Sequence, residues 1–316
     1  VRWILIIFMC LVGLYSLGAG FATLPFQRII SETISTSRRS TFFGARLVAG
    51  GILAMLAGTV VKSVLGNESL AWPRNYGILF ALSFVSLAIA YSAMSCLRFP
   101  AMVSLQSSVA LPPMLEETRN TWKEYPVLKR LIGVRLLSGG LPLALPFLTL
   151  YATREVGVSL GWVGIFIAAQ QGGAILANFG WIPLGNRFGT RSVILCGLVL
   201  AAVSLTFISC LAAASVFTLA FALAGAAMSA IKVGFDGYIL ELGHPEIRPL
   251  LFALEGTLLM PLYFMPLMGG FLADQLGYRA LVVIGGLLLV GAIGFARILC
   301  EPRRGDSACG PCRGTE

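Results

Sequence analysis

Charged residues and histidine are scarce in this sequence. Only 12% of the 316 residues are charged and His244 is the single histidine, whereas 57% are hydrophobic and the mean hydropathy is +0.87. So few charges exclude a soluble globular domain, whose surface needs more of them. One histidine excludes a histidine-based metal cluster, and we expect neither a metal nor a cofactor. Nucleotide-binding glycine loops and nucleophile elbows are also missing, so the sequence does not predict an enzyme or an ATP-driven protein.

The apolar residues are gathered in long continuous runs. A helix needs about 20 mostly apolar residues to cross a bilayer core of about 30 Å. Runs of this length predict an all-α polytopic membrane protein with nine transmembrane helices. The predicted spans are 3–26, 42–65, 76–96, 129–152, 160–184, 192–212, 215–241, 249–273 and 279–298.

Lysine and arginine are divided unevenly between the two sides that these spans define. Eighteen of the 23 lie on one side, which the positive-inside rule assigns to the cytoplasm. We therefore expect a multi-pass protein of the cell inner (plasma) membrane with a cytoplasmic C-terminus. The net charge of +9 follows from the same excess, so we expect no nucleic-acid partner.

The longest polar stretch separates three spans from six. Residues 98–128 contain Pro112, Pro113 and mixed charges, which predicts a cytoplasmic linker. Because the chain also opens at Val1 directly into a span, we expect a six-plus-six protein that has lost its first three helices. The expected domains are 1–97 (remainder of an N-terminal bundle, three transmembrane helices), 98–128 (linker), 129–298 (C-terminal six-helix bundle) and 299–316 (cytoplasmic tail).

Two segments of the C-terminal half repeat one pattern. "LGNRFGTRS" (184–192) aligns without a gap with "LADQLGYRA" (272–280), at an offset of 88 residues. This offset is three spans, an odd number, so the two copies fall on opposite faces of the membrane, as in an inverted repeat. Glycine permits a reversal with positive φ, and Asn or Asp can cap the next helix. The matched pairs include Asn186 with Asp274, Gly189 with Gly277 and Arg191 with Arg279.

These motifs resemble the major facilitator superfamily. "GNRFGTRS" is similar to the family loop signature Gly-x-Leu-Ala-Asp-Arg-x-Gly-x-Arg, with Asn186 where the family usually has Asp. "GGFLADQLGYR" (269–279) resembles the loop between the last two family helices, and "RIISETISTSRRSTFFGARLVAGG" (28–51) the link between the fourth and fifth. The nine spans then correspond to family helices four to twelve. The resemblance makes the following residues gating-loop elements: Gly185, Asn186, Arg187, Gly189, Arg191, Asp274, Gly277 and Arg279.

The resemblance implies transport of a small solute by alternating access, in which two helical bundles rock about a site at the membrane midplane. It further implies a secondary transporter (a symporter or efflux antiporter) that is coupled to protons or Na+ and lies as a monomer in the lipid bilayer. The first helix of each three-helix repeat would line the cavity, here 3–26, 129–152 and 215–241. A non-transporting sensor or assembly factor on the same scaffold remains the alternative, because fold does not determine function.

Charged residues within the predicted spans are the candidate substrate and coupling site. Lys232 and Asp236 are spaced i, i+4 on one helical face, so they can pair. Glu255 lies in the next, antiparallel span, where about 9 Å of rise places it at a similar depth. In one interpretation Lys232 binds an anionic group while Asp236 or Glu255 exchanges a proton. In the other, Lys232 and Asp236 form a fixed gate near the cytoplasmic mouth, with Lys232 snorkelling.

Other polar residues are weaker candidates. Gln171 and Asn178 are seven residues apart on one face, where they can bind substrate or make interhelical hydrogen bonds. Arg135 lies two turns into its span and can meet an anion or sit at the membrane interface. "CGPC" (309–312) looks like a thiol redox pair, but it lies in a short polar tail without a βαβ context, which argues against redox activity.

Overall fold

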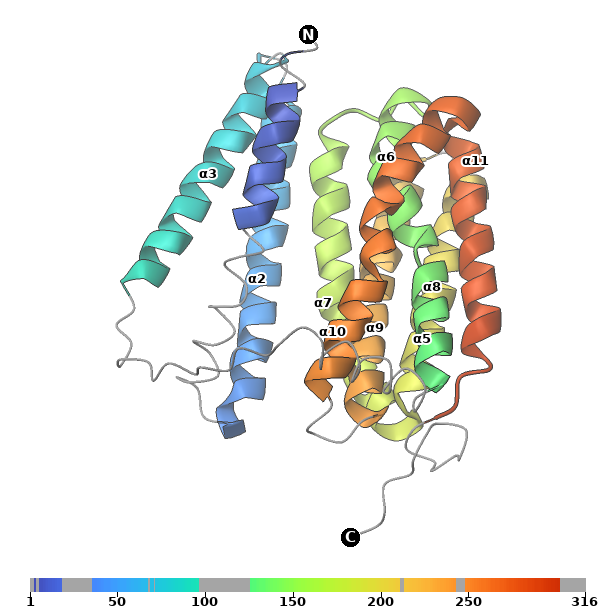
Figure 1. Cartoon of the computed structure of the whole chain (residues 1–316). Coiled ribbons are helices and arrows are strands. Elements are labelled where there is room, and N and C mark those ends of the chain that lie inside the picture. Colours follow the sequence, from blue (N-terminus) through green and yellow to red (C-terminus); the bar gives the residue numbers. More distant parts are fainter. Residues whose placement is uncertain are drawn as a thin grey trace. The chain divides into compact units, whose positions relative to one another are not determined.

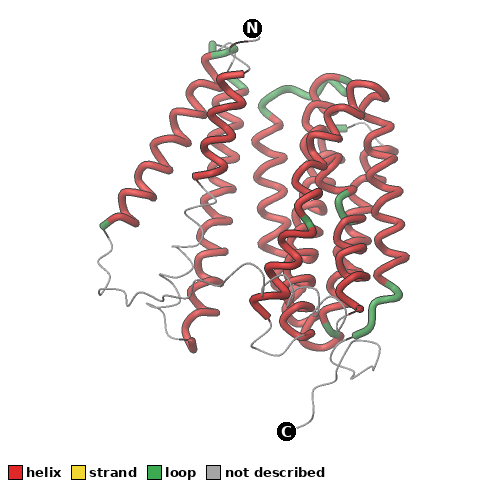
Figure 2. The backbone as a smooth tube through the Cα atoms, viewed as in Figure 1, coloured by secondary structure: helices red, strands yellow, loops and turns green. Residues whose placement is uncertain are grey.

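The computed structural model describes residues 3, 6–18, 36–67, 69–70, 72–96, 126–210, 213–242 and 248–301. All regular structure within these ranges is helical, and none of the described residues lies in a strand (Figure 2). Apolar sequences favour helices in a bilayer because a helix satisfies its own backbone hydrogen bonds, which lipid cannot do. The predicted all-α fold class is confirmed. The "CGPC" segment and most of the predicted linker 98–128 lie outside the described residues.

The chain divides into two compact units, residues 1–50 and 51–316, and each is described by itself. The first unit holds the apolar helix Ile6–Gly18 and the beginning of α2 (Thr36–Leu65). The second unit holds the rest of α2, helix α3 (Arg74–Ser95) and a larger helical bundle.

The larger bundle runs from residue 126 to residue 301 and is drawn from green to red in Figure 1. Helix α9 packs against α7 and α8, while α11 packs against α6 and α8. Buried apolar side chains from all of these helices form one continuous core. The elements are α5 (Pro126–Leu137), α6 (Gly140–Arg154), α7 (Trp162–Phe188), α8 (Thr190–Cys210), α9 (Ala214–Leu242), α10 (Arg248–Leu258), the 3-10 helix η1 (Met260–Phe264) and α11 (Met265–Ala296).

Within the described part of the chain, six helical segments are long and apolar enough to cross a membrane. The last, Leu250–Ala296, has 47 residues. At about 1.5 Å per residue this is more than twice the thickness of a bilayer core, so it contains both of the final predicted spans. Two shorter apolar helices, Ile6–Gly18 and Ala49–Leu65, match two further predictions. Each predicted span therefore overlaps a helical segment of the described residues.

Two glycines reverse the chain where the sequence repeat places them. Gly189 has φ 89° and ψ 165°, and Gly277 has φ 82° and ψ 166°, so the two aligned positions share one unusual backbone conformation. Figure 1 shows these reversals at opposite ends of the bundle, after α7 and within α11. This agreement supports the inverted repeat.

The repeated motif contains more helix than the sequence predicts. Helix α7 continues to Phe188 and α8 begins at Thr190, so a single residue, Gly189, makes the turn. Asn186 therefore lies inside α7, and Asp274 lies inside α11. Both residues are therefore helical, where the sequence predicts a loop. The physical reason is that one glycine with positive φ is enough to reverse the chain.

Small residues bring α6 and α11 into backbone contact. A Cβ atom built on Gly140 would lie 2.2 Å from the carbonyl oxygen of Gly285, and one built on Gly285 would lie 2.6 Å from that of Gly140. Such contacts are typical of membrane helices, where close backbone approach supplies packing energy that the hydrophobic effect does not. The span predicted at 129–152 is also interrupted at Ser138 and Gly139, just before this contact.

Candidate functional site

Helix α9 carries Lys232 and Asp236, two of the candidate site residues predicted from the sequence. Lys232 Nζ and Asp236 Oδ2 are 3.2 Å apart, so the predicted i, i+4 ion pair is present. Their side chains are 75% and 43% exposed in the isolated chain. Charged groups at membrane depth avoid lipid and face a bundle interior or a water-filled cavity. The exposed side of this pair is therefore a candidate cavity wall.

Arg135 on α5 approaches α9 from the neighbouring helix. Its guanidinium carbon lies 4.9 Å from the centroid of the Phe235 ring, one residue before Asp236. Its Nε atom is buried and has no hydrogen-bond partner among the described residues. The structure thus places the Arg135 side chain against another helix of the bundle, which does not fit an arginine extended toward lipid headgroups.

Glu255 on α10 completes the group. Its side chain is 9% exposed, and it interacts electrostatically with Arg135, Asp236 and Lys232. Within the described ranges no ion pair or hydrogen bond holds its carboxylate. We call Arg135, Lys232, Asp236 and Glu255 the charge cluster.

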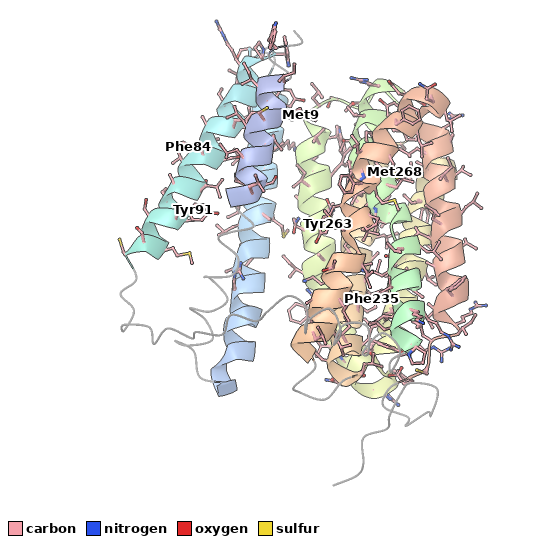
Figure 3. The ribbon with its side chains drawn as sticks, viewed as in Figure 1. Met9, Phe84, Tyr91, Phe235, Tyr263 and Met268 are labelled. Atoms are coloured by element: carbon pink, nitrogen blue, oxygen red, sulfur yellow. The ribbon has the colours of Figure 1, made fainter. Side chains whose placement is uncertain are left out.

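The charge cluster draws on α5, α9 and α10, which meet through one continuous apolar core. Phe235, which contacts Arg135 from α9, is labelled in Figure 3. Three residues predicted together from sequence, Lys232, Asp236 and Glu255, are therefore brought together, and Arg135 joins them.

The amide candidates on α7 lie in a different environment. Asn178 Oδ1 accepts a hydrogen bond from Ser229 Oγ of α9, and Trp181 Nε1 donates to the carbonyl oxygen of Ala226, 3.2 Å away. Gln171 is half-buried, and within the described residues no hydrogen bond links Gln171 or Asn178 to the charge cluster. For Asn178, the interhelical hydrogen bond left open by the sequence is the one observed.

The arginines of the repeated motif each tie a reversal to another part of the bundle. Arg191 Nη2 donates to the carbonyl oxygen of Arg297 at 2.6 Å, and Arg279 Nε donates to Tyr151 Oη at 3.3 Å. The remaining motif residues lie at or near the two reversals: Gly185 and Arg187 in α7, with the Arg187 guanidinium 5.2 Å from the Phe188 ring centroid, and Asp274, which is exposed.

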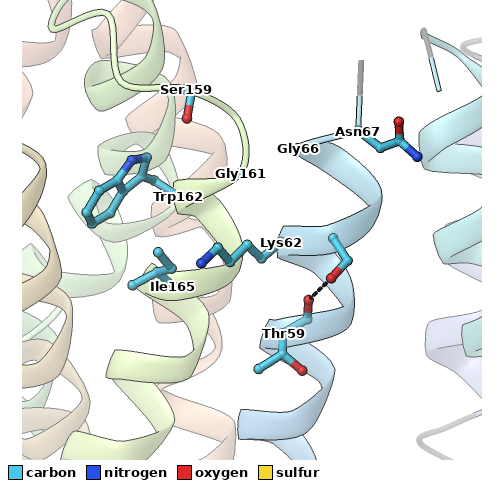
Figure 4. A pocket seen from close by; sticks show the side chains of 9 residues that line it. Thr59, Lys62, Gly66, Asn67, Ser159, Gly161, Trp162 and Ile165 are labelled. Carbon is cyan, nitrogen blue, oxygen red and sulfur yellow. Dashed lines mark hydrogen bonds between the residues drawn. The ribbon is translucent and has the colours of Figure 1, made fainter. Parts of the chain in front are cut away.

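Sequence reasoning missed one cavity in the second unit. It has a volume of about 740 Å³ and lies between the C-terminal end of α2 and the N-terminal end of α7 (Figure 4). Lys62 is the single charged residue of its lining, beside Trp162. The sequence indicates this cavity only through short polar residues close to a helix end. Such residues are common in loops, so they do not predict a cavity. The other lining residues are Thr59, Ser63, Gly66, Asn67, Ser159, Gly161 and Ile165.

A bundle of apolar helices with two inverted reversals and a group of interacting charges defines the class of multi-pass inverted-repeat membrane proteins. The family model of the Major Facilitator Superfamily matches residues 131–309, which is more than half of the chain. The chain therefore belongs to the Major Facilitator Superfamily, a family of secondary transporters, and the resemblance drawn from the sequence motifs is confirmed. Comparison with curated proteins gives no match.

Proposed function

We propose that this protein moves a small solute across the cell inner (plasma) membrane by alternating access, coupled to protons or Na+. The observation that carries the proposal is the charge cluster, in which four ionisable side chains from three apolar helices interact electrostatically. A charge on a membrane helix costs at least about 3 kcal/mol at mid-bilayer. Such a cost is seldom retained for packing alone, so the cluster supports a substrate or coupling role.

The helices that carry the charge cluster occupy positions that alternating access requires to move. Helices α5 and α6 form the span 126–154 and α9 forms the span 214–242, which correspond to the first helices of two three-helix repeats. Glu255 lies on α10, which is followed at once by the short helix η1. Interrupted helices next to a site let one segment shift while its neighbours stay packed. The uneven distribution of lysine and arginine supports a cytoplasmic C-terminus.

Flux measurements test this proposal. The protein, expressed from its complete gene and reconstituted into vesicles, is expected to move at least one class of small solute, and a proton or Na+ gradient should drive accumulation. Absence of flux for a broad solute panel under either gradient would favour a sensor or assembly factor instead.

Lys232→Ala distinguishes a functional ion pair from a fixed one. An exposed i, i+4 pair contributes only about 0.3–0.5 kcal/mol to stability, so the thermal midpoint should change little. We expect transport to fall sharply all the same. Unchanged flux would mean that Lys232 and Asp236 are a packing pair. Lys129→Ala, on the exposed side of α5, is the control.

A further inference from the structure

The charge cluster is electrically balanced but unevenly paired. It contains two cations and two carboxylates, so its formal charge is zero when all four groups are ionised. Lys232 and Asp236 neutralise each other across 3.2 Å. Arg135 and Glu255 interact electrostatically, yet no ion pair joins them in the described structure. The cation and the acid that lack a direct partner are thus the two that lie deeper in the bundle.

Arg135 has the geometry of an anion receptor. Its guanidinium carbon lies 4.9 Å from the centroid of the Phe235 ring, which holds the group in place. A carboxylate binds along the edge of a guanidinium, because the N–H donors lie in its plane. The buried Nε has no hydrogen bond within the described residues. Nε and one terminal nitrogen together form the planar fork that matches the two oxygens of a carboxylate. A carboxylate bound there would supply the hydrogen bonds that this edge lacks.

Binding of an anion would change the charge of the cluster from zero to minus one. In a site of low dielectric that excess is costly, and the least costly response is for one acid to take up a proton. Asp236 is already paired with Lys232, whose Nζ lies 3.2 Å from Oδ2. Glu255 is buried and has no such partner, so it is the acid that responds. The charged groups that interact with Glu255 are Arg135, Asp236 and Lys232.

We infer that the transported solute is a small organic monoanion whose carboxylate binds Arg135, and that Glu255 takes up one proton each time the anion binds. This rests on the proposed function. The proton passes from water to a Glu255 carboxylate oxygen, and the cluster returns to zero charge. Loss of that proton restores the Glu255 anion. The Glu255 anion then competes with the solute for the positive charge of Arg135, which favours release of the solute. Anion and proton therefore move together.

Matched pairs of probes test the charge requirement. Acetate, lactate and benzoate are compared with acetamide, lactamide and benzamide, which have similar shapes but no charge. We expect carboxylates to stabilise the purified protein against thermal unfolding and to be taken up by vesicles, and the amides to do neither. Equal effects of amides and carboxylates, or no binding of any carboxylate, would overturn the inference.

The pH dependence of the dissociation constant tests the proton. Because binding takes up one proton, raising the pH should weaken carboxylate binding by up to about tenfold per pH unit, over the range in which free Glu255 is ionised and bound Glu255 is protonated. In Glu255→Gln the dissociation constant should no longer depend on pH, because the side chain at position 255 stays neutral. Anion binding to this variant should take up no proton. A pH-independent dissociation constant in the unaltered protein would contradict the role of Glu255. Glu155→Gln, at an exposed position after α6, is the matched control and should keep the pH dependence.

Arg135→Ala should abolish carboxylate binding, whereas Arg130→Ala, at an exposed position on the same helix, should retain it. Full carboxylate affinity in Arg135→Ala would overturn the inference. The two proposals fail in different ways. If vesicles take up only neutral solutes, the protein is a transporter but the anion site is wrong. If carboxylates bind and no solute is transported, the transport function itself is contradicted.

Discussion

At the residue scale, the contact between Arg135 and Phe235 sets the direction in which the guanidinium can act. The ring centroid lies 4.9 Å from the guanidinium carbon, and the N–H donors in the guanidinium plane stay available to a ligand. An arginine held in this way loses less conformational entropy on binding than a mobile one. Phe235 is therefore a positioning residue for Arg135.

Phe235→Leu should weaken anion binding without abolishing it. A cation–π contact contributes about 0.5–2 kcal/mol, which corresponds to roughly a 2- to 30-fold higher dissociation constant. Because the guanidinium loses its support but keeps its charge, the pH dependence should survive. Titration of the purified variant with benzoate measures the change, and Phe179→Leu, an exposed ring on α7, should show none. Complete loss of binding would mean that Phe235 touches the solute itself.

At the element scale, glycine determines how closely the helices pack and where the chain reverses. Gly140 and Gly285 bring α6 and α11 into backbone contact, whereas Gly286, one residue further along, has no atom within 4 Å of a built Cβ. Gly189 and Gly277 adopt a region of φ and ψ that is essentially restricted to glycine. The same residue type thus serves two distinct physical purposes in one bundle.

Gly140→Ala should destabilise the bundle, because its Cβ would lie 2.2 Å from the Gly285 carbonyl oxygen. Overpacking of this kind costs about 1–3 kcal/mol. Thermal unfolding in detergent should show a lower midpoint for this variant, while Gly286→Ala keeps the midpoint of the unaltered protein. Equal midpoints for the two variants would show that α6 and α11 can separate without loss.

The two reversing glycines should differ in their sensitivity to substitution. Alanine at either position incurs backbone strain of about 1–3 kcal/mol. At Gly189 the new Cβ would also lie 2.3 Å from the carboxylate of Glu301, whereas at Gly277 nothing lies within 4 Å. Gly189→Ala should therefore unfold at a lower temperature than Gly277→Ala. Equal unfolding temperatures would show that the Glu301 carboxylate moves aside without cost, and the reverse order would contradict the prediction.

At the scale of the whole molecule, the repeat in the C-terminal bundle has a consequence for membrane topology. Its two copies are separated by three spans, so their reversals lie at opposite ends of the bundle (Figure 1). The positive-inside rule predicts that the end near Gly189 faces the cytoplasm. Topology is thus a property that can be measured without knowing the solute.

Reporter fusions at the two reversals should therefore give opposite results. A reporter that is active only in the cytoplasm should be active when fused after Gly189 and inactive when fused after Gly277. A fusion at the C-terminus should again be active, because one further span returns the chain to the cytoplasm. Activity at both reversals would contradict the inverted repeat.

Much of the fold could be predicted from the sequence, because lipid leaves an apolar run few alternatives to a helix. The spans and the pairing of Gly189 with Gly277 follow from local patterns of this kind. The ends of the helices were harder to predict. The sequence predicts that Asn186 and Asp274 lie in loops, but a single glycine makes each turn and both residues are helical.

The sequence by itself determined that the chain is a helical membrane protein with an inverted repeat, and that Lys232 can pair with Asp236. Both rest on spacing along one chain. Only the tertiary structure decided that Arg135 lies over Phe235 and shares an electrostatic environment with a buried Glu255. These residues belong to three helices that are distant in sequence, and their meeting depends on how the helices pack. Helix periodicity does not determine that packing, because it depends on how side chains of different helices fit together in the folded bundle.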